Sequence, residues 1–287
     1  MQTIKKYIKE ENMKKRVLSV LLCVVMSVVM LMGCGNKGTD KNGASKDNKK
    51  TLKLACVAFN YDEVNDPVAI NKLKKLGYDV KVIVMEDATT MNEACMKGEI
   101  DASLHQHKPW MDAYNKSKKR NMVMLKPYIH YNVFGIYSKK WKNIKDIPNG
   151  AKVCLGEDSS NQARGLLMLQ KAGMIKIKDG VTVPTTLDIA QNPKNLKFTT
   201  VNVAQVMSSL PDVDICLSAK MFQVSNKISQ DTEIYTSDDL YNFGVGFVVS
   251  PDNANAKWAK DLTDAYTTPE MKKDINKIFK GCYVPGK

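Results

Sequence analysis

The sequence lacks the features that mark several large classes of protein. Hydrophobic residues make up 44% and charged residues 25% of its 287 positions, with only 16 Gly and 10 Pro. These fractions exclude a disordered chain and a collagen-like fibre. Repeated apolar stretches long enough to span a bilayer are missing, which excludes a multi-span membrane protein. The length fits one large domain or two of about 100–150 residues, each with its own core.

Clustered positive charge is also missing. The formal net charge is +13, but four of these charges lie in residues 1–33 and three in 35–50, which leaves +6 for residues 51–287. The lysines there are scattered, and no segment interleaves Arg with aromatic residues. A groove that follows a phosphate backbone needs clustered cations. Nucleic acid is therefore not an expected partner.

The amino terminus has the pattern of an export signal. Met13 and three basic residues precede the uncharged apolar segment 17–32, which is shorter than the roughly 20 residues of a bilayer-spanning helix. We therefore expect a signal peptide over residues 1–33. Residues 1–12 include the acidic pair Glu10 and Glu11, which is not typical of such a signal. Met13 rather than Met1 is therefore the expected start.

Cys34 follows this signal in a setting that resembles the lipobox of bacterial lipoproteins, Leu31-Met32-Gly33-Cys34. The resemblance implies that Cys34 is lipidated and becomes the amino terminus of a protein anchored in the bacterial cell envelope, outside the cytoplasm. Residues 34–50 then form a flexible tether, whose lysines favour an anionic membrane surface. A plain signal peptide, or a membrane anchor with a chance cysteine, is the alternative.

Five cysteines remain once Cys23 leaves with the signal and Cys34 is lipidated. An odd number without CxxC spacing predicts buried thiols rather than a disulfide framework or a zinc site. Cys154 and Cys216 could serve as nucleophiles at strand ends, but their apolar neighbours favour the inert thiol. GxSxG, HExxH and P-loop motifs are missing, as is a GxGxxG motif at a strand-to-helix junction, so an enzyme is not expected.

Beyond residue 50 the chain alternates short apolar runs with longer amphipathic ones. Repeated strand–helix–strand units predict an α/β fold with mostly parallel sheets flanked by helices. The strands are too many for one compact sheet, which predicts two lobes. Strands are expected at 52–59, 78–85, 100–104, 121–125, 151–155, 196–201, 213–217 and 245–249, and helices at 63–76, 89–97, after Pro109, and at 161–172, 253–266 and 268–280. A run of β-branched and aromatic residues lies at 128–137.

An exported two-lobed α/β protein suggests a solute receptor, because such folds close around ligands at the carboxyl ends of their strands. The most specific segment is GEIDASLHQHKPWMD at 98–112. It resembles the lipoprotein NlpA family, the substrate-binding lipoproteins of methionine ABC importers, and the resemblance covers 51–287. It is supported by four further runs: IYSKK (136–140), LQKAG (169–173), KDG (178–180) and NPKNLK (192–197).

The resemblance implies a type II periplasmic-binding-protein fold. Lobe 1 is expected at 51–130 plus 246–287, and lobe 2 at 131–245. The implied partners are a small-molecule ligand, an ABC permease and its ATPase, and the membrane through the lipid on Cys34. The protein is expected to be a monomer without a cofactor.

The family pocket combines aromatic rings with an Arg for the ligand carboxylate and two Asn for the zwitterion. Arg164 matches that Arg. Ser159, Ser160 and Asn161 are N-cap candidates that place Arg164 in the first turn of a helix. The free N–H groups there would attract an anion together with the guanidinium. A surface Arg on an amphipathic helix is the alternative.

Three further residues are candidates for ligand contact. His107 matches a family His, Trp110 stands where the family has a Tyr, and His105 replaces a common Phe. Aromatic faces make favourable contacts with a thioether. Trp110 as a core residue is the alternative.

Three positions depart from the family pattern. Ala88 stands at a pocket Tyr, and Ala219 and Val245 stand at the two Asn. A zwitterion without those Asn loses charge-assisted hydrogen bonds worth about 1.5–3 kcal/mol each. Either nearby polar residues substitute, or the ligand is not a free amino acid. The candidate substitutes are Asn202, Gln205 and Asn242.

Two other kinds of protein stay open. His105, His107 and His130 lie close in sequence and could bind a metal ion, which would make the chain a receptor for a metal or another non-amino-acid solute. An adhesion or decoy surface protein on the same scaffold would have the same sequence features.

Overall fold

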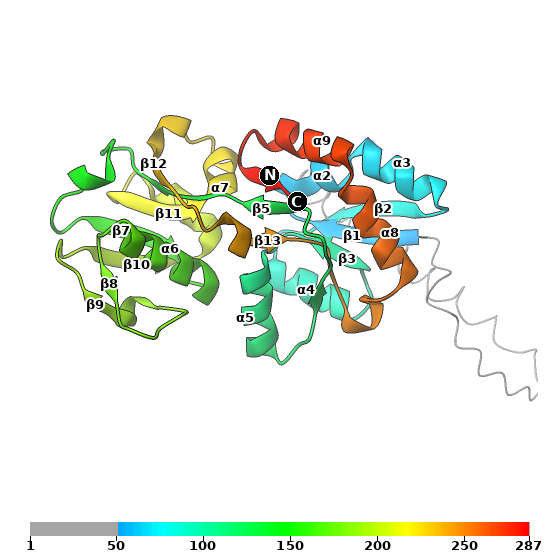
Figure 1. Cartoon of the computed structure of the whole chain (residues 1–287), viewed down its shortest axis with the longest axis horizontal. Helices are drawn as coiled ribbons and strands as arrows, with labels where there is room; N and C mark the ends of the chain where they lie inside the picture. Colours follow the sequence, from blue (N-terminus) through cyan, green and yellow to red (C-terminus); the bar gives the residue numbers. More distant parts are fainter. Residues whose placement is uncertain (1–50, 287) are drawn as a thin grey trace, which may run out of the picture. The chain divides into compact units, whose positions relative to one another are not determined.

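The computed structural model describes residues 51–286 (Figure 1). Two five-stranded sheets with separate hydrophobic cores dominate this part of the chain. The expected signal at 1–33, the lipidation of Cys34 and the tether at 34–50 lie outside the described residues. From residue 51 to residue 286, no helix is both long and apolar enough to cross a membrane.

The first sheet has the strand order β2-β1-β3-β14-β4. β1 (Thr51–Cys56) pairs in parallel with β2 (Asp79–Val84) and β3 (Ala102–Leu104). β14 (Val248–Val249) pairs antiparallel with β3 and with β4 (Val123–Met124). The apolar side chains of β1 are buried on both faces, as expected for a central strand between two helix layers.

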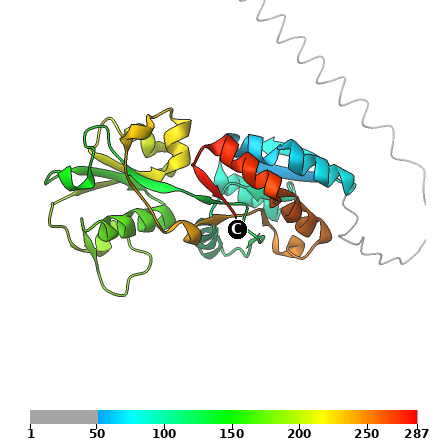
Figure 2. The same ribbon diagram turned by 45° about the horizontal axis from the view of Figure 1, so that its top comes forward.

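Several helices of this part begin at a residue whose side chain caps them. The side chains of Asp66, Asp87 and His107 each accept a hydrogen bond from the first turn of the helix that follows. α8 and α9 come from the end of the chain but lie beside α3 (Figures 1 and 2). The helices that accompany the first sheet are α2 (Tyr61–Val64), α3 (Pro67–Lys75), α4 (Ala88–Met96), α5 (Lys108–Lys118), α8 (Lys257–Tyr266) and α9 (Pro269–Phe279).

The second sheet has the strand order β10-β7-β11-β6-β12. Its strands β10, β7 and β11 are parallel, and β6 pairs antiparallel with both β11 and β12. One core packs α6 and α7 against it. The elements are β6 (Phe134–Tyr137), β7 (Lys152–Gly156), α6 (Ser159–Lys171), β10 (Lys197–Val201), β11 (Ile215–Ala219), α7 (Lys220–Ser225) and β12 (Glu233–Thr236).

Two chain segments connect the five-stranded sheets, and they lie side by side. β5 (His130–Asn132) leads into β6, and β13 (Gly244–Val245) leads into β14. β5 pairs antiparallel with β13 and with β15 (Tyr283–Pro285). Gly244 is required here, because an added Cβ would lie 2.1 Å from the Tyr128 ring.

A short hairpin, β8 (Lys176–Ile177) and β9 (Ile189–Gln191), follows α6.

The expected α/β class with two helix-flanked sheets is confirmed, with three corrections. Both large sheets are mixed rather than mostly parallel, because the connecting segments enter them antiparallel. The helix expected at 63–76 is two helices, because Pro67 has no N–H to continue α2 and instead starts α3. The strand expected at 245–249 divides between two sheets, as does the β-branched and aromatic run at 128–137. The sequence did not predict α7, β8, β9, β12 or β15.

The cysteines of the described chain are free and buried, as predicted. Burial raises the thiol pKa of Cys56 and Cys95 to about 12 and that of Cys282 to about 11. Because the thiolate is the reactive form, we expect alkylation of these thiols by iodoacetamide at pH 8 to be at least tenfold slower in the native protein than in denaturant. Peptide mass spectrometry measures both rates, and equal rates would contradict their burial.

Candidate functional site

Arg164 lies on α6, whose start differs from the sequence prediction. Asp158 is the N-cap, and its carboxylate accepts hydrogen bonds from the Asn161 backbone N–H at 3.0 Å and from the Ser160 hydroxyl at 2.8 Å. Ser159, Ser160 and Asn161 are therefore inside the helix rather than caps. Arg164 consequently lies in the second turn of α6 rather than in the first.

The Arg164 guanidinium is buried, and the residue is only 2% exposed. Its Nε and Nη2 atoms donate to the Asp239 carboxylate at 3.2 and 2.8 Å, and Nη2 also donates to the Asn132 carbonyl at 3.1 Å. The Phe134 and Phe243 rings lie 4.7 and 3.7 Å from its central carbon. Burial lowers the pKa of Arg164, and Asp239 opposes that shift. Nη1 has no hydrogen-bond partner within the described residues.

His107 connects α5 with α6. Its Nδ1 accepts a hydrogen bond from the Trp110 backbone N–H at 3.2 Å, so the proton is on Nε2, which lies 3.3 Å from the Asn161 Oδ1 acceptor. The Phe243 ring stands edge-on at 5.1 Å. Burial, with a smaller contribution from the charge of Arg164, lowers the pKa of His107 to about 4, so the ring is neutral at pH 7.

Trp110 and His105 form a second aromatic group beside this contact. Trp110 is half-buried, stacks on Tyr114 at 5.8 Å between ring centroids, and packs at the edge of a core cluster. His105 stands edge-on to Trp110 at 6.3 Å. Both ring nitrogens of His105 are shielded from solvent and have no partner in the described chain, and this burial lowers its pKa to about 3.

The predicted site residues therefore come together in two groups. Phe243 touches both His107 and Arg164, while His105 and Trp110 lie beside each other. Sequence reasoning missed Asp239 and Phe243. Their only local signal is a polar and aromatic stretch that precedes the β13 strand.

The positions that depart from the family pattern are also placed by the structure. Ala219 and Val245 are buried, and the backbone of Val245 forms an isolated bridge with His107, whereas Ala88 is half-buried at the start of α4. Each of the three candidate substitutes for the family Asn is exposed, and Asn202 already caps the short helix that follows it. They are Asn202, Gln205 and Asn242.

His130 does not join the other two histidines. Its Nδ1 lies 2.7 Å from Glu63 Oε1, and both side chains are fully buried. Within residues 51–286, no three His, Cys, Asp or Glu side chains are grouped as metal ligands would be.

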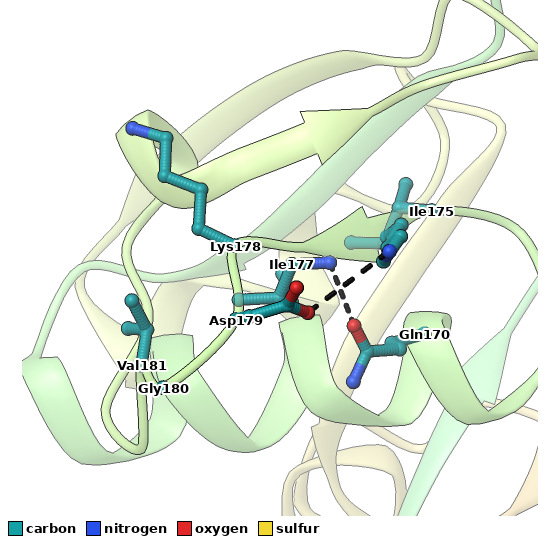
Figure 3. A pocket seen from close by; sticks show the side chains of 8 residues that line it. Gln170, Ile175, Ile177, Lys178, Asp179, Gly180 and Val181 are labelled. Atoms are coloured by element: carbon teal, nitrogen blue, oxygen red, sulfur yellow. Dashed lines mark hydrogen bonds and ion pairs between the residues drawn. The ribbon is translucent and has the colours of Figure 1, made fainter.

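A hollow beside the β8 strand contains none of the predicted site residues (Figure 3). The Gln170 side-chain oxygen accepts a hydrogen bond from the Ile177 backbone N–H at 2.6 Å, and Lys176 lies 4.0 Å from Asp179. The Lys178 ammonium donates to the Leu187 carbonyl at 2.9 Å, so these polar groups have partners within the protein.

The two low histidine pKa values predict a pH-dependent stability. The unfolded chain takes up protons near pH 6.5 that the native rings of His105 and His107 do not bind until about pH 3 and 4. Stability is therefore fully present above pH 6.5 and falls as the pH decreases toward 4, by at most about 1.4 kcal/mol per pH unit for each ring.

His105→Phe removes two unpartnered ring nitrogens without opening a cavity. We expect it to raise the free energy of unfolding by about 1 kcal/mol at pH 7.5 and to reduce the loss between pH 6.5 and 5. Urea unfolding of the wild type and the variant at pH 7.5, 6.5 and 5 measures both effects. An unchanged pH slope would show that His105 is not a buried neutral ring.

Residues 52–287 match the model of the NlpA lipoprotein family. The chain is 33% identical over 260 residues to the D-methionine-binding lipoprotein MetQ of Escherichia coli K12, covering 89% of this chain and 93% of that one.

Two solved structures are similar over the described part. A nutrient-binding protein from Burkholderia cenocepacia bound to methionine is 34% identical, with a TM-score of 0.75 over 82% of this chain and 99% of that one. A periplasmic substrate-binding protein of an ABC transporter from Coxiella burnetii is 29% identical, with a TM-score of 0.75 over 82% and 100%.

Proposed function

From the premise that this chain belongs to the NlpA lipoprotein family, we propose that it captures methionine, or a related amino acid or carboxylate, between two lobes and delivers it to a membrane permease. The family comprises solute-binding lipoproteins rather than enzymes, and the chain is a substrate-binding lipoprotein of the ABC-transporter kind. The ligand class is the proposal, and it takes its support from the relatives named for methionine.

The observation that carries the proposal is the Arg164 guanidinium. It is buried, lies over the Phe134 and Phe243 rings, and keeps one nitrogen without a partner among the described residues. A buried unpaired donor costs free energy unless an acceptor meets it. A carboxylate oxygen of the ligand at Nη1 would meet that requirement.

We place lobe 1 at 51–130 plus 246–287 and lobe 2 at 131–245. In this arrangement His107 and Trp110 belong to lobe 1 and Arg164 to lobe 2. A ligand that touches both lobes stabilises the closed form by its differential affinity for that form. The hydrogen bond between His107 and Asn161 would add to the same closure.

The partners follow from the family. An ABC permease and ATPase receive the solute, and lipid on Cys34 holds the monomeric receptor at the membrane of the bacterial cell envelope. Trp110 and His105 would contact the apolar part of the ligand, since aromatic rings contact thioethers favourably.

Native mass spectrometry of the purified protein tests the ligand class. It is measured first without added ligand and then with L- and D-methionine, other amino acids, simple carboxylates, and Zn²⁺ or Mn²⁺ ions. We expect a mass increment of one methionine or a close relative. Exclusive retention of a metal ion would favour the receptor for metals instead, and no increment from any probe would contradict the proposed ligand class.

A further inference from the structure

Two cysteines of the second sheet lie directly opposite each other. Cys154 is in β7 and Cys216 is in β11, and the two residues are partners in the register of these neighbouring parallel strands. Partners on adjacent strands lie about 4.8 Å apart, with their side chains on the same face of the sheet. Disulfides join Cα atoms that are about 4.4–6.8 Å apart. The sheet therefore holds these two cysteines at a separation that a disulfide can bridge.

The two thiols also interact with each other. Both cysteines are free, and each is at most 1% exposed. A hydrogen bond between the two thiols lowers the pKa of Cys154 and raises that of Cys216, and the Ser209 side chain lowers the pKa of Cys154 further. Burial instead raises the pKa of the other three thiols of the described chain to 11 or 12. Because the thiolate is the nucleophile, Cys154 is the thiol of this group that is best placed to react.

The pair lies under a thin cover. Cys154 and Cys216 belong to a small core cluster that is separate from the core beneath α6. Two 3-10 helices of three residues each, Val203–Gln205 and Met207–Ser209, pack on this side, and the Cys216 thiol donates to the Val206 carbonyl at 3.1 Å. Such short helices have poor hydrogen-bond geometry, and a local opening requires less free energy than global unfolding. A small oxidant can therefore reach the thiols while the sheet stays folded.

We propose that Cys154 and Cys216 are a redox-reactive pair, which a peroxide converts to an intramolecular disulfide in the folded protein. The Cys154 thiolate attacks one peroxide oxygen, the O–O bond breaks, and hydroxide leaves, which gives a sulfenic acid. The Cys216 sulfur then attacks the Cys154 sulfur and displaces a second hydroxide. The protons that the two thiols release convert both hydroxides to water. The two sulfur atoms are oxidised, and hydrogen peroxide is reduced to two molecules of water.

The location of the protein favours this chemistry. In the cell envelope, where the lipoprotein family places the chain, no cytosolic thioredoxin or glutathione keeps thiols reduced. The bond would join β11 to β7, the strand that leads to the Asp158 cap of α6. It does not depend on which ligand the protein binds.

Peptide mapping of the full-length protein tests the proposed bond. The folded protein is treated with hydrogen peroxide at pH 7.5, denatured in the presence of iodoacetamide, and digested with trypsin without a reductant. Cleavage after Lys and Arg places Cys154 in the peptide 153–164 and Cys216 in the peptide 198–220. We expect these two peptides to be linked, with a mass equal to their sum less two hydrogen atoms, and to be separated by dithiothreitol.

The other three thiols of the described chain are internal controls. We expect Cys56, Cys95 and Cys282 to be oxidised at least tenfold more slowly than the pair and to be alkylated after denaturation, since reactivity follows the thiolate fraction. Oxidation of all five thiols at the same rate would overturn the assignment of a special reactivity to Cys154 and Cys216.

Three variants test the pairing itself. Cys154→Ala and Cys216→Ala each remove one partner and should abolish the linked peptide. Cys282→Ala is the matched control, because Cys282 is equally buried but has no place in this pair, and the linked peptide should form as in the wild type. Thermal unfolding checks that each variant is folded, and the mapping of the wild type decides the question for any variant that is not.

The wild-type result can overturn the proposal in two ways. The linked peptide could be missing, whether both thiols are still alkylated or each is oxidised separately. It could also form only when peroxide is added in denaturant, which would show that the folded sheet does not allow the bond.

Discussion

Replacement of Arg164 by Ala is expected to weaken methionine binding by 30-fold or more. The substitution removes the cation that lies over the Phe134 and Phe243 rings and the donor assigned to the ligand carboxylate. Loss of a hydrogen bond to a charged group costs about 1.5–3 kcal/mol, and 1.4 kcal/mol corresponds to a factor of ten in affinity. Calorimetric titration at pH 7.5 measures the change.

Lys171→Ala provides the matched control for Arg164→Ala. Lys171 lies on the same helix and pairs with the neighbouring acid Asp238, but both side chains are largely exposed. Such pairs contribute little, so methionine affinity should change less than twofold. A change below threefold in Arg164→Ala would remove Arg164 from the site. An equally large change in Lys171→Ala would assign the effect to α6 as a whole.

Replacement of Glu63 by Ala is expected to cause the largest loss of stability, about 3 kcal/mol or more. The Glu63 carboxylate is fully buried and accepts hydrogen bonds from His130 Nδ1 at 2.7 Å and from the Asn60 side-chain amide at 2.8 Å. His130 stacks on Tyr283 at 3.9 Å, so the contact ties α2, β5 and β15 together. Truncation leaves two buried donors unpaired, and breaking a buried pair typically costs 3–5 kcal/mol.

Thermal unfolding and urea titration measure the effect of Glu63→Ala. For a chain of this size the expected decrease in Tm is roughly 6–12 °C. Asp62→Ala is the matched control, because Asp62 is exposed in the same helix and should change stability by less than about 0.5 kcal/mol. Glu63→Gln keeps an acceptor of the same shape and should be milder than Glu63→Ala. Equal, small effects of all three variants would show that the buried pair does not support the fold.

The comparison of prediction with structure is clearest at α6. The amphipathic pattern predicted a helix at 161–172, and the helix begins two residues earlier at Ser159 because Asp158 caps it. That shift moves Arg164 from the first turn to the second. The predicted place of Arg164 in the first turn was therefore wrong, whereas the choice of Arg164 as a ligand-binding candidate remains a prediction, supported by its burial and its unpartnered nitrogen.

The connecting segments show why some elements could not be predicted. In residues 128–137, β-branched and aromatic side chains continue without a break, so the sequence does not show where one strand ends and the next begins. Their division into β5 and β6 depends on pairing with β13, β15 and the second sheet, which are distant in sequence. Short strands such as β8 and β9 have no periodicity of their own and form only through their mutual pairing.

The sequence by itself determined the α/β class and the family. It also determined that the thiols between residues 51 and 286 are buried and form no disulfide. Each of these follows from local periodicity, short motifs or cysteine spacing. Tertiary structure alone decided which polar side chains meet. Arg164 and Asp239 are 75 residues apart, and His130 and Glu63 are 67 apart. Such pairs are invisible to local patterns because contacts between distant residues form only when whole elements pack, and here they set the charge balance at Arg164 and the packing of β5.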